Sequence, residues 1–239
     1  KVVQQNDKTA VKWYTLSAEQ GYASAQYNLG VMYDFGKGVL ENDKTAVKWY
    51  TLASEQGLAK AQYNLGVMYD FGKGVPEHDK TAVKWYTLAA EQGLAKAQYN
   101  LGIMYDYGKR VPENDKTAVK WYTLAAEQGL AKAQYNLGIM YDFGKGVPEN
   151  DKTAAEWYTL AAEQGNSSGQ YLLGLMYHHG VGVLTDNQRA YMWYNLASYN
   201  GSERAGENKD KLAKDMTPAD ISKAQGMSSR CLKSNYTGC

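Results

Sequence analysis

Apolar residues recur along the chain with the spacing of an α-helix, in short runs that end at glycine. In the segment 42–77 the first run falls at i, i+3, i+4 and i+7, one face of a helix: Ala46, Trp49, Tyr50 and Ala53. The second run repeats this logic: Ala61, Leu65, Met68 and Tyr69. Asn42 offers N-cap chemistry, and Gly57 suits the left-handed residue that closes a helix. The pattern predicts a helical hairpin of about 36 residues.

This hairpin is repeated. The six tryptophans are each 36 residues apart: Trp13, Trp49, Trp85, Trp121, Trp157 and Trp193. A fixed period in this range is typical of stacked repeats, because a lone hairpin cannot bury its apolar face. The sequence therefore predicts an all-α solenoid over 1–201, with units near 6–41, 42–77, 78–113, 114–149, 150–185 and 186–201 plus a divergent second helix.

Both ends depart from the repeat. Residues 202–215 align with a second helix but are mostly polar, and Thr217-Pro218-Ala219-Asp220 reads as the start of another helix. We therefore expect 202–239 to hold capping helices and a cysteine-containing tail. Residues 1–5 align with an inter-repeat loop, so we expect the first helix to start near Asn6 and the natural gene to extend upstream of Lys1.

The repeat resembles a known family. The segment 82–111 reads A-x-x-W-Y-x-x-A-A-E-Q-G-x-A-x-A-Q-x-x-L-G-x-M-Y-x-x-G-x-R-V, which closely resembles the Sel1-like repeat, with Arg110 in place of a glycine. The resemblance covers residue 6 to about 185, and a sixth first helix through Gly201. It implies a right-handed αα-superhelix related to tetratricopeptide repeats, with the first helices on the concave face. It also implies an adaptor for other proteins, in bacterial envelope, secretion or host-contact settings. A few cysteine-rich relatives have been credited with β-lactam hydrolysis.

Composition and charge narrow the range of partners. With 26 Lys and Arg against 25 Asp and Glu, the net charge of +1 gives no basis for predicting a nucleic-acid partner. No run of 18 apolar residues exists, so we predict no membrane insertion. The sequence leaves the oligomeric state open.

Catalytic chemistry has little support, and we predict no enzyme, cofactor or metal site. The adjacent His178 and His179 cannot chelate like an i, i+4 pair, and His78 stands at a helix start, so a structural or solvated role is expected for all three. No S-x-x-K motif exists, and the carboxylates recur in every unit, which marks them as scaffold. Arg110 indicates either a rearranged loop or a charge placed for a partner; we favour a tolerated substitution.

The predicted interaction surface lies opposite the core stripe of the first helices. Lysines and glutamates recur there: Lys12, Lys48, Lys84, Lys120, Glu19, Glu55, Glu91 and Glu127. A row of asparagines follows the second helices: Asn28, Asn64, Asn100 and Asn136. Their amides either hydrogen bond to an extended peptide or join neighbouring helices. Tyr191 and Tyr199 either anchor a partner or pack under the capping helices.

The only cysteines are Cys231 and Cys239, in the last nine residues. We favour a disulfide that folds the tail back onto the last helix, over two reduced thiols. A disulfide would place the chain in an oxidising compartment, the bacterial periplasm or exterior.

These features predict a non-enzymatic scaffold that binds a protein or peptide. The first alternative is an immunity protein that blocks a secreted bacterial effector. The second is a weak hydrolase, for which no nucleophile–base pair is visible.

Overall fold

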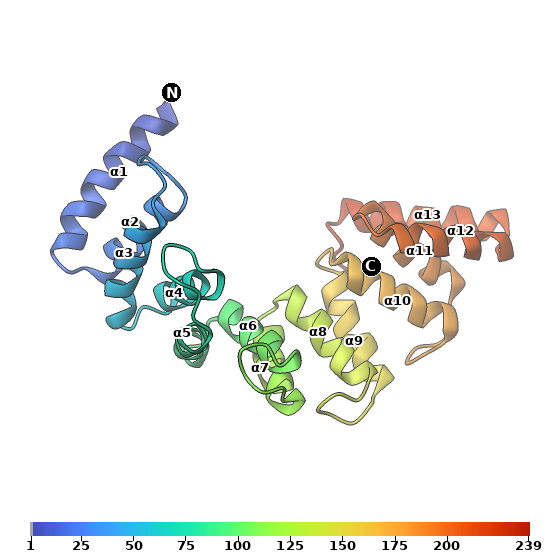
Figure 1. Ribbon diagram of the computed structural model, residues 1–239. Coiled ribbons are helices and arrows are strands. Elements are labelled where there is room, and N and C mark those ends of the chain that lie inside the picture. The colour runs from blue at the N-terminus through green and yellow to red at the C-terminus, as the bar shows by residue number, and fades with distance from the viewer. Residues whose placement is uncertain (1) are drawn as a thin grey trace. The chain divides into compact units, whose positions relative to one another are not determined.

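A computed structural model describes the backbone of residues 2–239, and in that range every regular element is helical. The helices run as antiparallel hairpins in chain order (Figure 1). The elements are α1 Val2–Glu19, α2 Ala23–Asp34, α3 Asp43–Glu55, α4 Ala59–Phe71, α5 Asp79–Glu91, α6 Ala95–Asp106, α7 Asp115–Glu127, α8 Ala131–Asp142, α9 Asp151–Ala162, α10 Ser167–His179, α11 Asn187–Tyr199, α12 Glu203–Leu212, η1 Ala213–Asp215 and α13 Pro218–Lys233. The predicted all-α repeat fold is confirmed.

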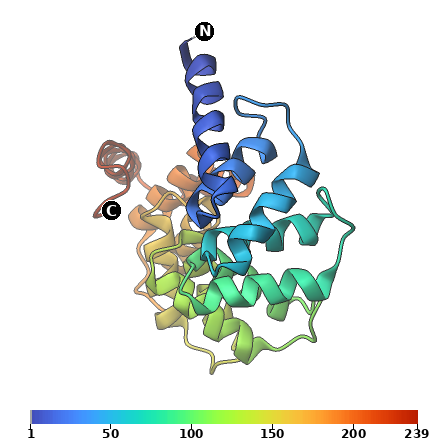
Figure 2. The ribbon, with the colours of Figure 1, turned by 90° about the vertical axis from the view of Figure 1, so that its left-hand side faces the viewer.

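The chain divides into two compact units, 1–113 and 114–239, and the division falls between two repeats. The first unit holds α1 to α6, whose hairpins follow one another in both views (Figure 1 and Figure 2). The second unit holds α7 to α13. The proposed boundary between the repeat array and the cap at 201/202 stays a prediction.

Helix boundaries follow the predicted chemistry. The side chain of Asn42 accepts a hydrogen bond from the Thr45 backbone N–H at 2.9 Å, and His78 caps α5 in the same way through Nδ1. Gly57 and Gly72 adopt φ values of 85° and 64°, the left-handed region where a side chain is strained. The N-cap role gives His78 the structural function that its position indicated.

The first helix begins earlier than predicted. α1 starts at Val2, not near Asn6, so the predicted loop over residues 1–5 is wrong for residues 2–5, and Lys1 lies outside the described residues. The alignment of residues 1–5 with residues 37–41 predicted a loop, but residues 2–5 lack the glycines that form this loop. The loop residues Gly36 and Gly38 have positive φ, whereas Val2-Val3-Gln4-Gln5 contains no glycine or proline to stop a helix.

The core of the repeat junctions within each unit is one tyrosine packed against one glycine. Tyr50 and Tyr86 are completely buried, and their rings lie against Gly30 and Gly66 of the preceding second helix. The second unit repeats the contact between Tyr158 and Gly138 and between Tyr194 and Gly174. Any side chain at these glycines would collide with the ring, so the glycines set how closely two repeats approach.

The tryptophans lie nearer the surface than the tyrosines. Trp49 packs against the cluster of Ala18, Ala25 and Leu29 in the preceding repeat, yet it keeps part of its surface exposed. Trp13 is 66% exposed. Trp193 is buried at 2% because it belongs to the cluster that holds Cys231 of α13.

The end of the second unit confirms the predicted capping helix. Thr217 caps α13 by accepting a hydrogen bond from the Asp220 N–H at 3.2 Å, with Pro218 at the first helical position. Ala224 of α13 packs in a buried cluster with Tyr191 and Ala190 of α11. Among residues 2–239, no helix is long and apolar enough to cross a bilayer.

We expect Gly66→Ala to destabilise the chain by about 1–3 kcal/mol, although alanine normally favours a helix by about 1 kcal/mol. The new Cβ would lie 2.8 Å from the Tyr86 ring. Urea unfolding followed by circular dichroism measures the difference.

The matched control is Gly226→Ala in α13, where a Cβ meets only Arg230 Nη1 at 3.6 Å. This variant should be neutral or stabilised by up to about 1 kcal/mol. Equal effects of the two substitutions would contradict the packing role of Gly66.

Candidate partner-binding surface

The buried tyrosine hydroxyls are satisfied by a polar network that joins three helices. Tyr50 Oη donates to Asp34 Oδ2 at 3.0 Å, and the Asn64 side chain hydrogen bonds to both Tyr50 and Tyr27. Burial is the main cause that raises the pKa of the Tyr50 hydroxyl, and the nearby Asp34 carboxylate raises it further. The hydroxyl therefore stays protonated and donates.

The same network recurs in the following junction, where Tyr86 donates to Asp70 at 3.1 Å and Asn100 bonds to Tyr86 and Tyr63. Two roles were open to the asparagine row: binding a peptide or joining neighbouring helices. Asn64 and Asn100 join neighbouring helices. Asn28 and Asn136 are half-buried. Asn208 of α12, which bonds to Tyr171, continues the row beyond Leu172.

In the second unit the polar network lacks the asparagine at one junction and the aspartate at another. Tyr158 donates to Asp142 at 3.0 Å, while the asparagine position is occupied by Leu172. Burial raises the pKa of the Asp142 carboxyl, and Asp151 adds to the shift. At the last junction His178 stands in place of the aspartate, with Nδ1 3.4 Å from Tyr194 Oη, and burial raises the pKa of Tyr194 to about 12. His178 therefore fills a structural position.

A second ladder of amides crosses the repeats at the turns between first and second helices. Gln56 Nε2 donates to Gln26 Oε1 at 2.7 Å, and Gln92 donates to Gln62 at 2.7 Å. In the second unit Gln164 donates to Gln134 at 2.7 Å, and Asn200 takes the same part toward Gln170 at 2.9 Å. Both glutamine positions recur with the 36-residue period, but the period alone does not indicate that these side chains pair with each other.

Beside this ladder the first unit contains an open cavity of about 500 Å³, which we call the turn groove. It is lined by α2 and by two successive turns: Ser24, Tyr27, Asn28, residues 57–60 and residues 92–94. Two turns and one helix thus frame a space large enough for a peptide side chain.

The predicted lysines and glutamates form what we call the first-helix face, and all of them are exposed: Lys12, Lys48, Lys84, Lys120, Glu19, Glu55, Glu91 and Glu127. Three of the lysines pair with the tryptophan that follows them. Lys48 Nζ lies 5.3 Å from the Trp49 ring centroid, and Lys84 lies at the same distance from Trp85. Lys120 lies 5.1 Å from Trp121. A cation over an aromatic ring at this distance gives a weak attraction and a mixed polar and aromatic surface.

Of the two C-terminal tyrosines, only one is available to a partner. Tyr199 is 72% exposed. Tyr191 is 5% exposed, packs with α13, and its hydroxyl lies 3.4 Å from Gln225 Nε2, so of its two expected roles it packs under the capping helix and is not an exposed anchor. Tyr191 and the buried Met192 form the surface on which the capping helix packs: Tyr191 stands where earlier first helices carry valine or alanine, and Met192 replaces their lysine or glutamate.

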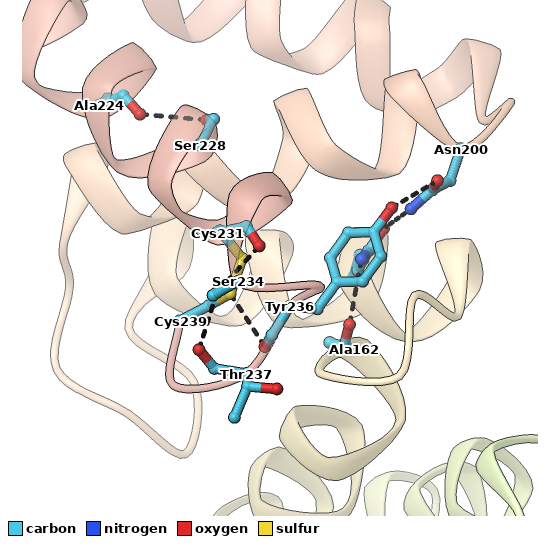
Figure 3. Close-up of a disulfide and its surroundings, with 10 residues drawn as sticks. Ala162, Asn200, Ala224, Ser228, Cys231, Ser234, Tyr236, Thr237 and Cys239 are labelled. Atoms are coloured by element: carbon cyan, nitrogen blue, oxygen red, sulfur yellow. Dashed lines mark hydrogen bonds between the residues drawn. A yellow bond between two sulfur atoms is a disulfide. The ribbon is translucent and has the colours of Figure 1, made fainter.

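A disulfide between Cys231 of α13 and Cys239 joins the C-terminal tail to this helix, and the two Cα atoms are 5.3 Å apart (Figure 3). The Tyr236 hydroxyl donates to Asn200 Oδ1 at 2.9 Å, and so extends the amide ladder into the tail. Within residues 2–239, no cluster of three His, Cys, Asp or Glu could hold a metal ion.

Comparison with known proteins identifies the family of the chain. The Sel1 repeat family matches residues 2–22, 23–58, 59–94, 95–130, 131–166 and 167–202. The chain belongs to the Sel1 repeat family. Proteins of this fold generally mediate protein–protein interaction. A search of curated proteins finds no match.

Solved Sel1 repeat structures show the same fold. A Sel1 repeat protein from Oxalobacter formigenes is 33% identical, with a TM-score of 0.77, over 93% of this chain and 96% of that one. The protective antigen c5321 from uropathogenic Escherichia coli is 31% identical, with a TM-score of 0.63, over 97% of this chain and 58% of the antigen. The immunity protein PA5088 from Pseudomonas aeruginosa is 21% identical, with a TM-score of 0.50, over 89% of this chain and 82% of that one.

Arg110 stands at a position where the other units of this Sel1 repeat array carry glycine. Its φ is 69°, the conformation that glycine adopts at this position in the other units. The guanidinium reaches the preceding junction, with Nη2 2.8 Å from Asp70 Oδ1 and 3.1 Å from Glu77, and Nε 2.6 Å from Asp79. The backbone conformation at Arg110 is therefore the one that glycine has in the other units, and the arginine adds a contact between repeats that neutralises the nearly buried Asp70 carboxylate.

We expect Arg110→Ala to destabilise the chain by about 1–3 kcal/mol, since Asp70 loses its cation while alanine keeps the strained backbone. The pairs with Glu77 and Asp79, both more than half exposed, add little.

The informative comparison is Arg110→Gly, which removes the same ion pairs but suits the positive φ. It should be about 1 kcal/mol more stable than Arg110→Ala in urea unfolding. If both variants unfold like the unmodified chain, the arginine contributes nothing to the junction.

Reduction of Cys231–Cys239 should lower stability by roughly 2–3 kcal/mol, because a closed loop restricts the unfolded chain. Thermal unfolding with and without a reductant tests this, and Cys231→Ser/Cys239→Ser, which cannot respond to reductant, is the control. An unchanged melting temperature in the unmodified protein would contradict a formed disulfide.

Proposed function

We propose that this Sel1 repeat protein is a non-enzymatic scaffold that binds a protein or peptide segment along the first-helix face, on the concave side of the array. One observation carries the proposal: the lysines and glutamates of that face are exposed in each of the first four repeats, while the residues that hold the repeats together are buried. A surface copied at a fixed interval suits an extended partner.

The charge of this face favours a partner with both signs of charge. Lysines and glutamates alternate on it, so a strongly acidic or strongly basic segment would meet repulsion as well as attraction. The Trp49 and Trp85 rings beside the lysines add apolar area to each repeat. This combination supports selective binding of moderate strength.

An oxidising compartment, the periplasm or the exterior, fits the Cys231–Cys239 disulfide. In such a setting an immunity function is the second candidate, and the fold likeness to the PA5088 immunity protein is its support. The two candidates differ in the partner: a scaffold holds a segment, whereas an immunity protein blocks the active site of a folded enzyme.

The experiment is affinity capture of partners from extract and culture supernatant of the source organism, followed by binding measurements with the purified partner. Lys48→Glu/Lys84→Glu should weaken binding roughly tenfold, because two charges at the interface are reversed. Stability should fall by no more than about 2 kcal/mol, since only exposed contacts to Trp49 and Trp85 are lost.

Lys211→Glu/Lys214→Glu makes the same charge change in the capping segment and serves as the control. If the partner binds both double variants as tightly as the unmodified protein, the first-helix face is not the binding surface. Turnover of a chromogenic β-lactam that survives repurification would instead support the hydrolase alternative.

A further inference from the structure

The C-terminal tail places the Tyr236 side chain against Gly165 and Asn200, which lie in two turns of the second unit, and we call this position the tyrosine seat. The Tyr236 hydroxyl donates to Asn200 Oδ1, and its ring lies so close to Gly165 that a Cβ on this glycine would be 3.1 Å from it. Asn200 in turn donates to Gln170, which donates to the Ala162 carbonyl (Figure 3). An aromatic side chain is thus held by stacking on a glycine and by one hydrogen bond to the amide ladder.

The conformation of the tail holds the Tyr236 side chain in this position. The Cys231–Cys239 disulfide closes the loop, and Ser234 Oγ donates to the Cys231 and Thr237 carbonyls at 3.1 and 2.9 Å. Asn235 and Tyr236 both adopt positive φ, at 51° and 67°. Such non-glycine conformations are rare and are retained here by the contacts around them.

The same seat exists in the first unit, and there it is empty of protein. Gly165 and Asn200 lie three repeats after Gly57 and Gln92, and both of these residues line the turn groove. No atom lies within 4 Å of a Cβ built on Gly57, in contrast to the tyrosine ring against Gly165.

The hydrogen-bonding chemistry of the two seats also matches. Gln92 uses its amide nitrogen to donate to Gln62, as Asn200 does toward Gln170, so the amide oxygen of Gln92 is the group that corresponds to the acceptor of the Tyr236 hydroxyl. Leu58 and Leu94 give the turn groove apolar walls. The site therefore combines an apolar slot with one acceptor, which suits a phenol.

We propose that the turn groove of the first unit binds a tyrosine side chain presented by a partner protein, in the manner of Tyr236 in the second unit. The proposal rests on the proposed function as a protein-binding scaffold and names the chemistry that one of its sites recognises. The chain's own tail does not supply the tyrosine, because the disulfide and the Asn200 hydrogen bond hold Tyr236 in its own seat.

The test uses the full-length protein and a cyclic disulfide peptide of residues 230–239 as the probe. In ¹⁵N NMR titrations we expect the peptide to shift the amide signals of Gly57, Gln92 and Gly93. The same peptide with Tyr236→Phe should bind about fivefold more weakly, because one hydrogen bond of about 1 kcal/mol is lost. Shifts confined to other residues, or equal affinity of the two peptides, would overturn the proposal.

Protein variants provide a second, independent readout. Gly57→Ala places a methyl group where the ring would lie and should reduce affinity for the tyrosine peptide at least tenfold. Gly201→Ala is its matched control, because Gly201 has a similar φ of 94°, has no atom near its Cβ position, does not line the groove and is not followed by the glutamine that completes the site. Equal binding by the two variants would show that the slot at Gly57 is not used.

The remaining outcomes separate this proposal from the broader function. If a captured partner binds Gly57→Ala as tightly as Gly201→Ala, the tyrosine site is wrong while the scaffold function stands. If reduction of the disulfide produces a dimer in sedimentation, and Tyr236→Phe abolishes it, the occupant is the tail of a second copy and the assignment to a partner protein is overturned.

Discussion

The contact between a glycine of one repeat and a tyrosine of the next is the constraint on which the junctions within each unit depend. Only a residue without a side chain leaves room for the ring of Tyr50 over Gly30, or of Tyr86 over Gly66. Burying the ring also buries a hydroxyl, which requires a hydrogen-bond partner in a dry interior. Aspartate and asparagine supply it, so the polar network among the helices is a consequence of the apolar packing.

The sequence predicts the repeat and its helices well, because these depend on local information. The i, i+3, i+4 spacing, the caps at Asn42 and Thr217 and the glycine stops at 57 and 72 all act within a few residues. The start of α1 was predicted wrongly for a related reason: the period carried a loop onto residues 2–5, which lack the glycines that make it.

The partner of a recurring polar side chain could not be predicted in this way. Asn64 lies at a position that suits either a bound peptide or a neighbouring helix, and only the distance to Tyr27 and Tyr50 decides between them. Tyr191 suits either an exposed anchor or a buried contact, and it is buried because α13 packs against α11. Both outcomes depend on contacts between elements distant in the sequence.

The regular period of the repeats has a consequence for how such a chain can change. Units 78–113 and 114–149 differ at only three positions. Because each repeat packs mainly on its neighbours, a whole repeat can be gained or lost while every junction keeps its glycine and tyrosine. The packing is therefore compatible with arrays of different length, whereas the tail with its two cysteines occurs once in the sequence.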